Sequence, residues 1–349
     1  MRAVGSGRSY PVAGVVRLPA VRAWSLYGAR LRSDHAFVNN VTVADDSTAS
    51  PCFELSFAYV DDAPLPDGWD RGHATYRSPL LIDDEQSFLY VIPVGTCTVF
   101  RFTDVVDFYI WPDRILCRLL DPAYAFMVEL HLLGFVMAYW LERRGILALH
   151  ASGVAFDRHA IGFLSTNTGG KSALAASFVQ AGHALLTDDI LAIESVGRAV
   201  FARPSYPQMR MWPELARHFL GSDDDLENVH PMLDKRRVPI RPGGFGTFCD
   251  SAQPLACLYV PERRAASDIR IRELAFGEAF FTLNRYSFLV GVLPVGGTEQ
   301  DRLAALGHVA SAVPVRSVAY PSGLERLPDV VEAISEDARA VLAQVGKAR

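Results

Sequence analysis

Lysine is scarce in this sequence of 349 residues, which has only three lysines: Lys171, Lys235 and Lys347. The chain carries 34 Lys+Arg against 39 Asp+Glu, a formal net charge of −5. A protein that binds nucleic acid normally has a basic surface, so this balance does not favour nucleic acid as a partner. Because lysines are so few, one that falls inside a motif stands out.

The sequence also lacks paired cysteines and a secretion signal. Its five cysteines contain no C-x-x-C motif and suit neither a disulfide framework nor a zinc site, so the expected compartment is a reducing cytoplasm. No apolar stretch of the signal-peptide type is seen at the N-terminus. One apolar run, residues 123–141, contains Glu129 and His131. Since polar groups are costly at bilayer depth, we expect a buried helix there and no membrane partner.

Composition and pattern indicate a globular chain of about two domains, with 50% hydrophobic residues available for a core. Alternating and apolar runs at 53–60, 89–94, 97–102, 107–111 and 115–117 predict strands, so residues 1–120 are interpreted as a smaller β-rich N-terminal domain. Residues 121–349 are interpreted as an α/β domain. Helices are predicted at 121–143, 171–181 and 328–345, strands near 154–156, 161–164, 184–187 and 190–193, and a loop-rich region at 200–260.

The strongest motif begins in the apolar strand at 161–164. It continues as Ser165-Thr166-Asn167-Thr168-Gly169-Gly170-Lys171-Ser172-Ala173, which leads into a helix. This is the arrangement of a phosphate-binding P-loop. Its glycines let backbone N–H groups approach phosphate oxygens, and the helix N-terminus adds a positive dipole end. The motif predicts that residues 165–173 bind a nucleotide, with Lys171 on the β- and γ-phosphates and Ser172 on Mg²⁺.

One position departs from the pattern G-x-x-x-x-G-K-[ST], because Ser165 stands where the first glycine is expected. If that position requires a positive φ, serine costs about 1–2 kcal/mol; if it does not, the replacement is harmless. The alternative interpretation of the whole segment is an ordinary glycine-rich turn between a strand and a helix.

Two adjacent carboxylates, Asp188 and Asp189, end a predicted strand just beyond the P-loop helix. In phosphoryl transfer one carboxylate can hold Mg²⁺ while another accepts the proton of the acceptor hydroxyl. His150 would tune the proton affinity of the pair if the strands lie side by side. Arg210 is a candidate for stabilising the transferring phosphoryl group, or else a surface arginine. Lys235 is a second cationic candidate, or else part of a solvated basic turn.

Three segments together resemble the catalytic core of HPr kinase/phosphorylase. They are Leu149-His150-Ala151-Ser152-Gly153-Val154-Ala155, the P-loop segment, and Gly182-His183-Ala184-Leu185-Leu186-Thr187-Asp188-Asp189. The resemblance implies a P-loop kinase core similar to that of phosphoenolpyruvate carboxykinase, with ATP and Mg²⁺ as cofactors and a serine hydroxyl as acceptor. It also implies that Asp188 is the general base with His150 as its partner, that Ser172 lies at the metal, and that Asp189 binds the metal or lies just behind its ligands; which of the two aspartates binds the metal is left open.

The acceptor side departs from that family. No Glu-Ile-Arg-Gly signature follows the acid pair, and the chain instead has Arg203-Pro204-Ser205-Tyr206-Pro207-Gln208-Met209-Arg210-Met211-Trp212-Pro213. This variant pattern resembles the HPr-kinase-related proteins of bacterial peptide-modification clusters, including lasso-peptide tailoring kinases. The prediction is a cytoplasmic kinase that phosphorylates a serine of a peptide or small protein, with the N-terminal region helping to recognise that acceptor. The alternatives are a non-catalytic nucleotide-binding regulator and a kinase of a small molecule, and homo-oligomerisation is left open.

Overall fold

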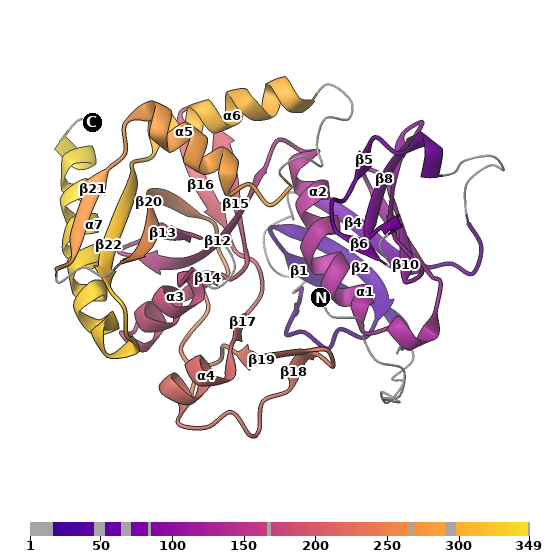
Figure 1. Cartoon of the computed structure of the whole chain (residues 1–349), viewed down its shortest axis with the longest axis horizontal. Helices are drawn as coiled ribbons and strands as arrows, with labels where there is room; N and C mark the ends of the chain where they lie inside the picture. The colour runs from indigo at the N-terminus through magenta and orange to yellow at the C-terminus, as the bar shows by residue number, and fades with distance from the viewer. Residues whose placement is uncertain are drawn as a thin grey trace.

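The computed structural model describes residues 17–44, 53–63, 71–82, 85–165, 169–264, 268–289 and 298–347. The chain is a mixed α/β protein with several sheets. Two halves lie side by side, the N-terminal half around a nine-stranded sheet and the C-terminal half around an eight-stranded sheet with helices packed on it (Figure 1).

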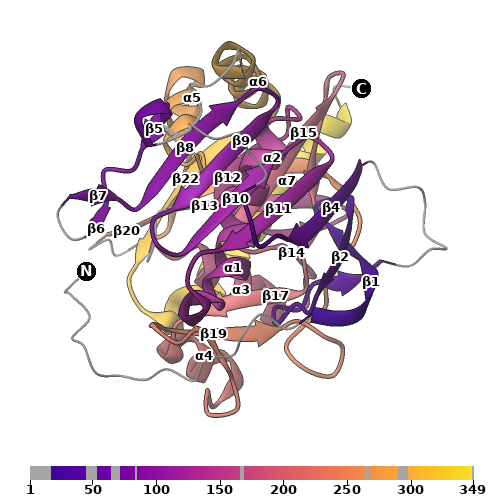
Figure 2. The same cartoon turned by 90° about the vertical axis from the view of Figure 1, so that its right-hand side faces the viewer.

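The N-terminal sheet has the strand order β3-β1-β2-β4-β11-β10-β9-β8-β5 and is seen face-on in Figure 2. Its strands are β1 (Arg17–Leu26), β2 (Ala29–His35), β3 (Thr42–Val43), β4 (Phe53–Tyr59), β5 (Tyr76–Arg77), β8 (Leu89–Val94), β9 (Cys97–Phe102), β10 (Val106–Ile110) and β11 (Arg114–Leu119). A turn of 3-10 helix, η1 (Arg71–His73), and a hairpin of β6 (Leu81–Ile82) with β7 (Gln86–Ser87) flank it. The strands predicted in this half are confirmed. In β4 the alternation has its expected cause, since Leu55 and Phe57 are buried while Glu54 and Ser56 are exposed.

The apolar run at 123–141 is buried as helix between the two halves, as predicted, but the helix is not continuous. It consists of η2 (Pro122–Tyr124), α1 (Met127–His131), a π-helical turn η3 (Leu132–Val136) and α2 (Met137–Glu142). Gly134 interrupts it with φ −99° and ψ −106°, a conformation outside the helical region. Among the described residues, no helix combines the length and the apolar character needed to cross a membrane.

A hydrogen-bonded carboxylate explains how the apolar run accommodates Glu129. His35 Nε2 lies 2.9 Å from Glu129 Oε1, and the backbone N–H groups of Val38 and Asn39 donate to the same carboxylate at 2.7 and 3.0 Å. Burial would raise the pKa of Glu129, but His35 and these donors hold it below its ordinary value. The loop after β2 is therefore fastened to α1.

The C-terminal sheet has the order β13-β12-β15-β16-β20-β22-β21, and β13 also pairs with β20, so that five of these strands close a ring. Its strands are β12 (Leu147–Phe156), β13 (His159–Leu164), β14 (Leu185–Thr187, paired with β12), β15 (Ile190–Val196), β16 (Ala199–Arg203), β20 (Gln253–Arg264), β21 (Arg270–Glu273) and β22 (Val315–Pro321). The helices are α3 (Lys171–Gln180), α4 (Pro213–Leu220), α5 (Phe276–Arg285), α6 (Thr298–Ala312), the 3-10 turn η4 (Leu324–Arg326) and α7 (Leu327–Lys347).

A separate three-stranded sheet lies beside the larger one, with the order β17-β19-β18. It is formed by β17 (Gln208–Met211), β18 (Asn228–His230) and β19 (Leu233–Pro239). The prediction that 200–260 is loop-rich is therefore wrong. These strands are short, and β17 pairs with β19 across more than twenty residues of intervening chain, a contact that local pattern does not reveal.

Apolar and polar contacts join the two halves. One cluster of buried side chains runs from Trp24 and Leu31 of the N-terminal sheet through Trp140 on α2 to Ala148 and Ile190 on β12 and β15. Three hydrogen bonds cross beside β17. Gln208 Nε2 donates to Asn39 Oδ1 at 2.7 Å, the backbone N–H of Asn40 donates to Gln208 Oε1 at 3.2 Å, and Arg203 Nη1 donates to the carbonyl of Tyr27 at 3.3 Å. The hydrophobic core of the N-terminal sheet thus continues past residue 120.

Candidate active site

Ser165 directly follows β13, and Gly169 and Gly170 directly precede α3, so a strand and a helix flank the predicted phosphate loop. Gly170 occupies the N-cap of α3 with φ +100°, a left-handed conformation that favours glycine, and Lys171 begins the helix. Ser165 is buried, and it does not adopt the left-handed conformation, so serine is compatible with the backbone there. Thr166, Asn167 and Thr168 lie outside the described residues, and their predicted contacts with phosphate stay predictions.

The first carboxylate of the acid pair, Asp188, faces the start of α3. Its Oδ1 accepts hydrogen bonds from Ser172 Oγ at 3.1 Å and from Ser152 Oγ at 2.5 Å. Its Oδ2 accepts the backbone N–H of Arg210 at 2.9 Å. The Ser172 hydroxyl and a carboxylate oxygen are therefore already adjacent at the helix N-terminus.

The second carboxylate, Asp189, is surrounded by cations and by a histidine. Its Oδ1 lies 3.1 Å from His150 Nε2 and 3.7 Å from Lys171 Nζ, and its Oδ2 accepts a hydrogen bond from Arg210 Nη1 at 3.1 Å. Burial would raise the pKa of Asp189. The hydrogen bond with His150 and the charges of Arg210 and Lys171 instead hold that pKa well below its ordinary value.

Backbone geometry separates the two carboxylates. Both lie in the turn between β14 and β15, where Asp189 has φ +76° and Asp188 does not adopt a positive φ, so the side chains take different directions. On β12, His150 pairs with Ile190 and Gly153 with Thr187, which places β12 beside the turn. His150 and Ser152 are two residues apart and share one face of the strand.

This arrangement corrects one predicted pairing. His150 contacts Asp189, and the expectation that it partners Asp188 is wrong. Ser172 contacts Asp188, and the expectation that Ser172 and Asp189 lie at a metal stays a prediction. The physical reason is the left-handed backbone of Asp189, which sequence alone did not reveal.

Arg210 is part of the site and is not a surface arginine. Its side chain is only 11% exposed, and its Nη2 donates to the Tyr206 hydroxyl at 3.3 Å. Burial disfavours its charge, but Tyr206, Asp189 and Asp188 raise the pKa of Arg210 above its ordinary value. The guanidinium is therefore a fixed positive charge beside Asp189.

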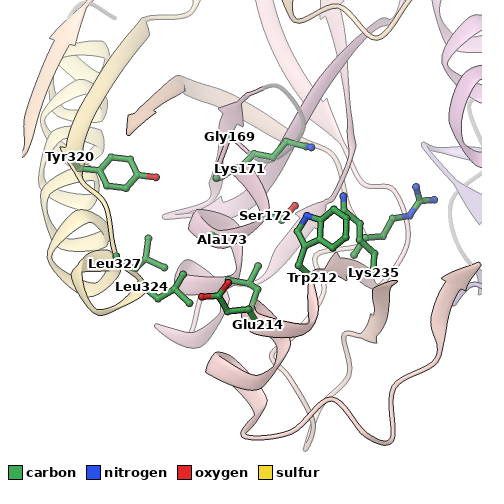
Figure 3. A pocket seen from close by; sticks show the side chains of 14 residues that line it. Gly169, Lys171, Ser172, Ala173, Trp212, Glu214, Lys235, Tyr320, Leu324 and Leu327 are labelled. Atoms are coloured by element: carbon green, nitrogen blue, oxygen red, sulfur yellow. The ribbon is translucent and has the colours of Figure 1, made fainter. Parts of the chain in front are cut away.

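A cavity of about 310 Å³ opens in front of the helix start (Figure 3). Its polar side is formed by Gly169, Gly170, Lys171, Ser172 and Ala173, the described end of the predicted nucleotide segment. Other elements contribute apolar and aromatic side chains, namely Trp212, Leu215, Tyr320, Leu324 and Leu327, together with Arg210, Glu214 and Gly323. A cationic and polar end joined to an apolar wall suits a nucleotide, whose phosphates and base differ in the same way.

Lys235 also lines this cavity, so the solvated basic turn considered from the sequence is wrong. It lies on β19, with Nζ 5.4 Å from the ring centroid of Trp212. Burial lowers the pKa of Lys235, while Asp188 and Asp189 act in the opposite direction. Two of the three lysines of the chain thus face one cavity (Figure 3).

The sequence did not identify Tyr27, which the N-terminal half places close to the acid pair. Tyr27 and Gly28 form the turn between β1 and β2, both with positive φ, and Tyr27 is 1% exposed. Burial, followed by the nearby Tyr206 and Asp189, raises the pKa of Tyr27 well above its ordinary value. The available signal was the Tyr-Gly dipeptide between two strand-like runs, which marks a turn but does not reveal its neighbours.

No protein-family model matches the chain, and no curated protein matches it. A comparison of structures matches it to the HPr(Ser) kinase/phosphatase from Coxiella burnetii, with 11% sequence identity and a TM-score of 0.30. The match covers 57% of this chain and 98% of that chain. A TM-score this low does not establish a shared fold, so a function has to be inferred from the side chains described above.

Proposed function

We propose that the protein is a Mg-ATP-dependent kinase that transfers the γ-phosphoryl group to a serine hydroxyl of a peptide or small protein. One observation carries the proposal. The hydroxyl of Ser172 and the carboxylate of Asp188 lie 3.1 Å apart at a helix N-terminus, and a second carboxylate, Asp189, lies beside Lys171 and Arg210. Phosphoryl transfer uses oxygen groups that hold the metal and a separate group that orients the acceptor, and the Ser172–Asp188 pair and Asp189 can fill these two roles.

The donor atoms fit a magnesium ion. Mg²⁺ prefers oxygen ligands and is commonly held by one or two protein oxygens together with substrate phosphates. Among the described residues no group of three or more His, Cys, Asp or Glu side chains is placed to hold a metal ion by itself. We assign Ser172 and Asp188 as the ligands, in place of Ser172 and Asp189. Bound Mg²⁺ would neutralise charge on the β- and γ-phosphates.

The residues of the loop would position the phosphates. The helix N-terminus at Lys171 offers backbone N–H groups and a positive dipole end, and Lys171 Nζ lies 3.7 Å from Asp189 Oδ1. The apolar wall formed by Leu215, Leu324 and Leu327 suits the purine base. Together these features hold the triphosphate with its end toward the acid pair.

We assign Asp189 as the proton acceptor. As the acceptor oxygen bonds to the γ-phosphorus, the bond from that phosphorus to the bridging oxygen breaks, ADP leaves with the electron pair, and the hydroxyl proton passes to Asp189. A carboxylate with a depressed pKa is a weak base, but the loose transition state of phosphoryl transfer needs positioning more than base strength. His150 and Arg210 hold the carboxylate in place, and Arg210 also offers charge to the phosphoryl oxygens.

A regulator without turnover is less well supported. That alternative was based on Ser165 in place of the first glycine of the motif. The backbone of Ser165 is not left-handed, so serine is tolerated there. The presence of both carboxylates, His150 and Arg210 in one cluster favours chemistry over binding alone.

The test is transfer from labelled ATP in the presence of Mg²⁺ to a library of short serine-containing peptides, with a panel of small hydroxylic compounds beside it. Lys171→Ala and Asp189→Asn are expected to lower transfer on the order of 10²-fold or more. Asp224→Asn, an exposed aspartate outside the cavity, is the control and should transfer as the parent does. Equal labelling by the parent, Lys171→Ala and Asp189→Asn would refute the kinase assignment. Labelling only of the small compounds would refute the peptide acceptor.

A further inference from the structure

A second cavity lies at the boundary between the two halves and meets the first one at a single side chain. It has a volume of about 550 Å³ and is lined on one side by the N-terminal half and on the other by β17, β18 and β19. Arg210 lines both this cavity and the nucleotide cavity. A molecule held in the second cavity would therefore contact the same arginine that lines the first cavity and pairs with Asp189.

Two arginines stand next to each other in the wall of this cavity. Arg210 on β17 and Arg237 on β19 are direct partners in the antiparallel register, so their side chains share one face of the small sheet. Both line the cavity, with side-chain exposures of 11% and 15%. Like charges directly opposite one another destabilise a sheet, so this pair requires negative charge close by.

Asp189 supplies negative charge to Arg210 from outside the cavity, and the acidic groups that line the cavity supply only part of what Arg237 requires. Glu227 pairs with Arg237, but its side chain is 75% exposed, so the attraction is screened by water. Glu129 also lines the cavity, yet both of its oxygens already accept hydrogen bonds from His35, Val38 and Asn39.

Arg210 itself has an unused donor. Its Nη1 donates to Asp189, but its Nε is buried and has no hydrogen-bond partner among the residues that the structure describes. His230, on the same wall, has a pKa lowered by burial and by the charge of Arg210. A neutral imidazole beside two guanidinium groups leaves room for an anion and adds no competing negative charge.

We propose that the second cavity is an acceptor site whose Arg210–Arg237 pair binds an anionic group, a carboxylate or a phosphate, carried by the substrate close to its reactive hydroxyl. That the bound molecule is a phosphoryl acceptor rests on the proposed kinase function. Binding of an anion in this cavity does not depend on turnover. Arg237 is a substrate-binding residue, and its guanidinium offers paired N–H donors that match the geometry of both anions.

Binding of two matched pairs of probes tests the proposal. N-acetylserine is compared with N-acetylserinamide, and glycerol 3-phosphate with glycerol, by calorimetric titration of the full chain with and without Mg²⁺ and a non-hydrolysable ATP analogue. We expect an anionic member to bind at least about tenfold more tightly than its neutral partner, the effect of one charge-assisted hydrogen-bonded pair. The probe pair with the larger preference for its anionic member shows whether the site binds a carboxylate or a phosphate.

Three variants separate the site from a general charge effect. Arg237→Gln should abolish the preference for the anion, and Arg237→Lys, which keeps the charge, should restore part of it. Arg236→Gln is the matched control, because Arg236 is the next residue on β19, does not line the cavity and pairs with Asp223. It should keep the preference. Thermal unfolding of each variant verifies that it is folded.

The outcomes of this test and of the kinase test are distinct. Failure of both anionic probes to bind, equal binding of neutral and anionic probes, or an unchanged preference in Arg237→Gln overturns the anion site while the kinase assignment stands. A preference that depends on Arg237 in a protein that binds no nucleotide supports the anion site and overturns the proposed function. Transfer to the preferred probe, lost in Arg237→Gln, supports both.

Discussion

At the scale of single residues, the acid pair shows how two identical neighbours acquire different chemistry. Asp188 accepts hydrogen bonds from two hydroxyl groups and one backbone N–H, whereas Asp189 faces His150, Lys171 and Arg210. The difference follows from one left-handed backbone conformation at Asp189. Hydroxyl neighbours suit a metal ligand, and cationic neighbours suit a carboxylate that must stay ionised.

The depressed pKa of Asp189 predicts that the turnover rate does not fall through protonation of this carboxylate as the pH is lowered. Burial raises this pKa, but His150, Arg210 and Lys171 lower it below the ordinary value of about 3.9, so the proposed base remains ionised from about pH 8 down to about pH 5. ATP turnover measured between about pH 8 and pH 5 should show no loss that titrates as a carboxylate. A fall in rate centred well above the ordinary aspartate value, and absent from Asp189→Asn, would contradict this environment.

The difference between the pKa of Asp189 in the folded and in the unfolded protein also predicts how the stability of Asp189→Asn depends on pH. Because the folded pKa is depressed, the stabilisation is fully present above the unfolded pKa and is lost as pH falls through the lower folded value. At neutral pH, Asp189→Asn should lower the free energy of unfolding by about 1–3 kcal/mol, because Arg210 and Lys171 lose their partner while the side chain is 24% exposed. Urea unfolding at neutral pH and near pH 3 should show this difference shrinking with acid, and Asp224→Asn should show neither effect.

At the scale of elements, the β1–β2 hairpin links the N-terminal sheet to the active site. Its turn has φ +53° at Tyr27 and +76° at Gly28, the pair of positive values that a two-residue hairpin favours. Arg203 donates from Nη1 to the Tyr27 carbonyl, and its Nη2 pairs with Glu194 at 2.6 Å. The hairpin therefore rests on a buried arginine that is itself held in place.

Gly28→Ala should destabilise the protein more than Gly95→Ala. Both glycines have positive φ, so alanine is strained at each by about 1–2 kcal/mol. A Cβ at Gly28 would also collide with Arg203 Nη1, whereas nothing lies within 4 Å of a Cβ at Gly95. We expect an additional loss of about 1–2 kcal/mol for Gly28→Ala, measured by urea unfolding of both variants. Equal losses would mean that Arg203 moves aside at no cost.

Sequence patterns predicted most elements and part of the site, and the failures share a cause. Local periodicity is sufficient for β4, β8, β9 and α3, because each has a buried face with a regular repeat or a glycine stop. It is insufficient for β17 and β19, which exist through pairing with each other, and for Gly134, where the long helix is interrupted. The contact of His150 with Asp189 in place of Asp188 depends on the backbone conformation of Asp189. The burial of Tyr27 depends on a contact with Arg203, which is distant in the sequence.

At the scale of the whole molecule, the two halves share one core and both contribute to the proposed reaction. The apolar cluster extends from Trp24 to Ile190, and the second cavity has walls from both halves. Folding of either half alone would leave the buried faces of α1 and α2 exposed to water. The two halves are therefore expected to unfold together.

Two buried cysteines, one in each half, can test this coupling. Cys117 on β11 and Cys257 on β20 are both fully buried, and burial raises the pKa of each thiol, so neither should react with a thiol reagent until its surroundings unfold. With increasing urea, a short pulse of reagent followed by mass spectrometry should label both at the same midpoint. The cavity proposed for Mg²⁺ and a non-hydrolysable ATP analogue is lined only by residues of the C-terminal half. The ligand should nevertheless shift both midpoints equally, because a ligand of the folded state stabilises the entire cooperative unit. Labelling of Cys117 at lower urea, unmoved by the nucleotide, would instead show that the N-terminal sheet unfolds independently of the catalytic half.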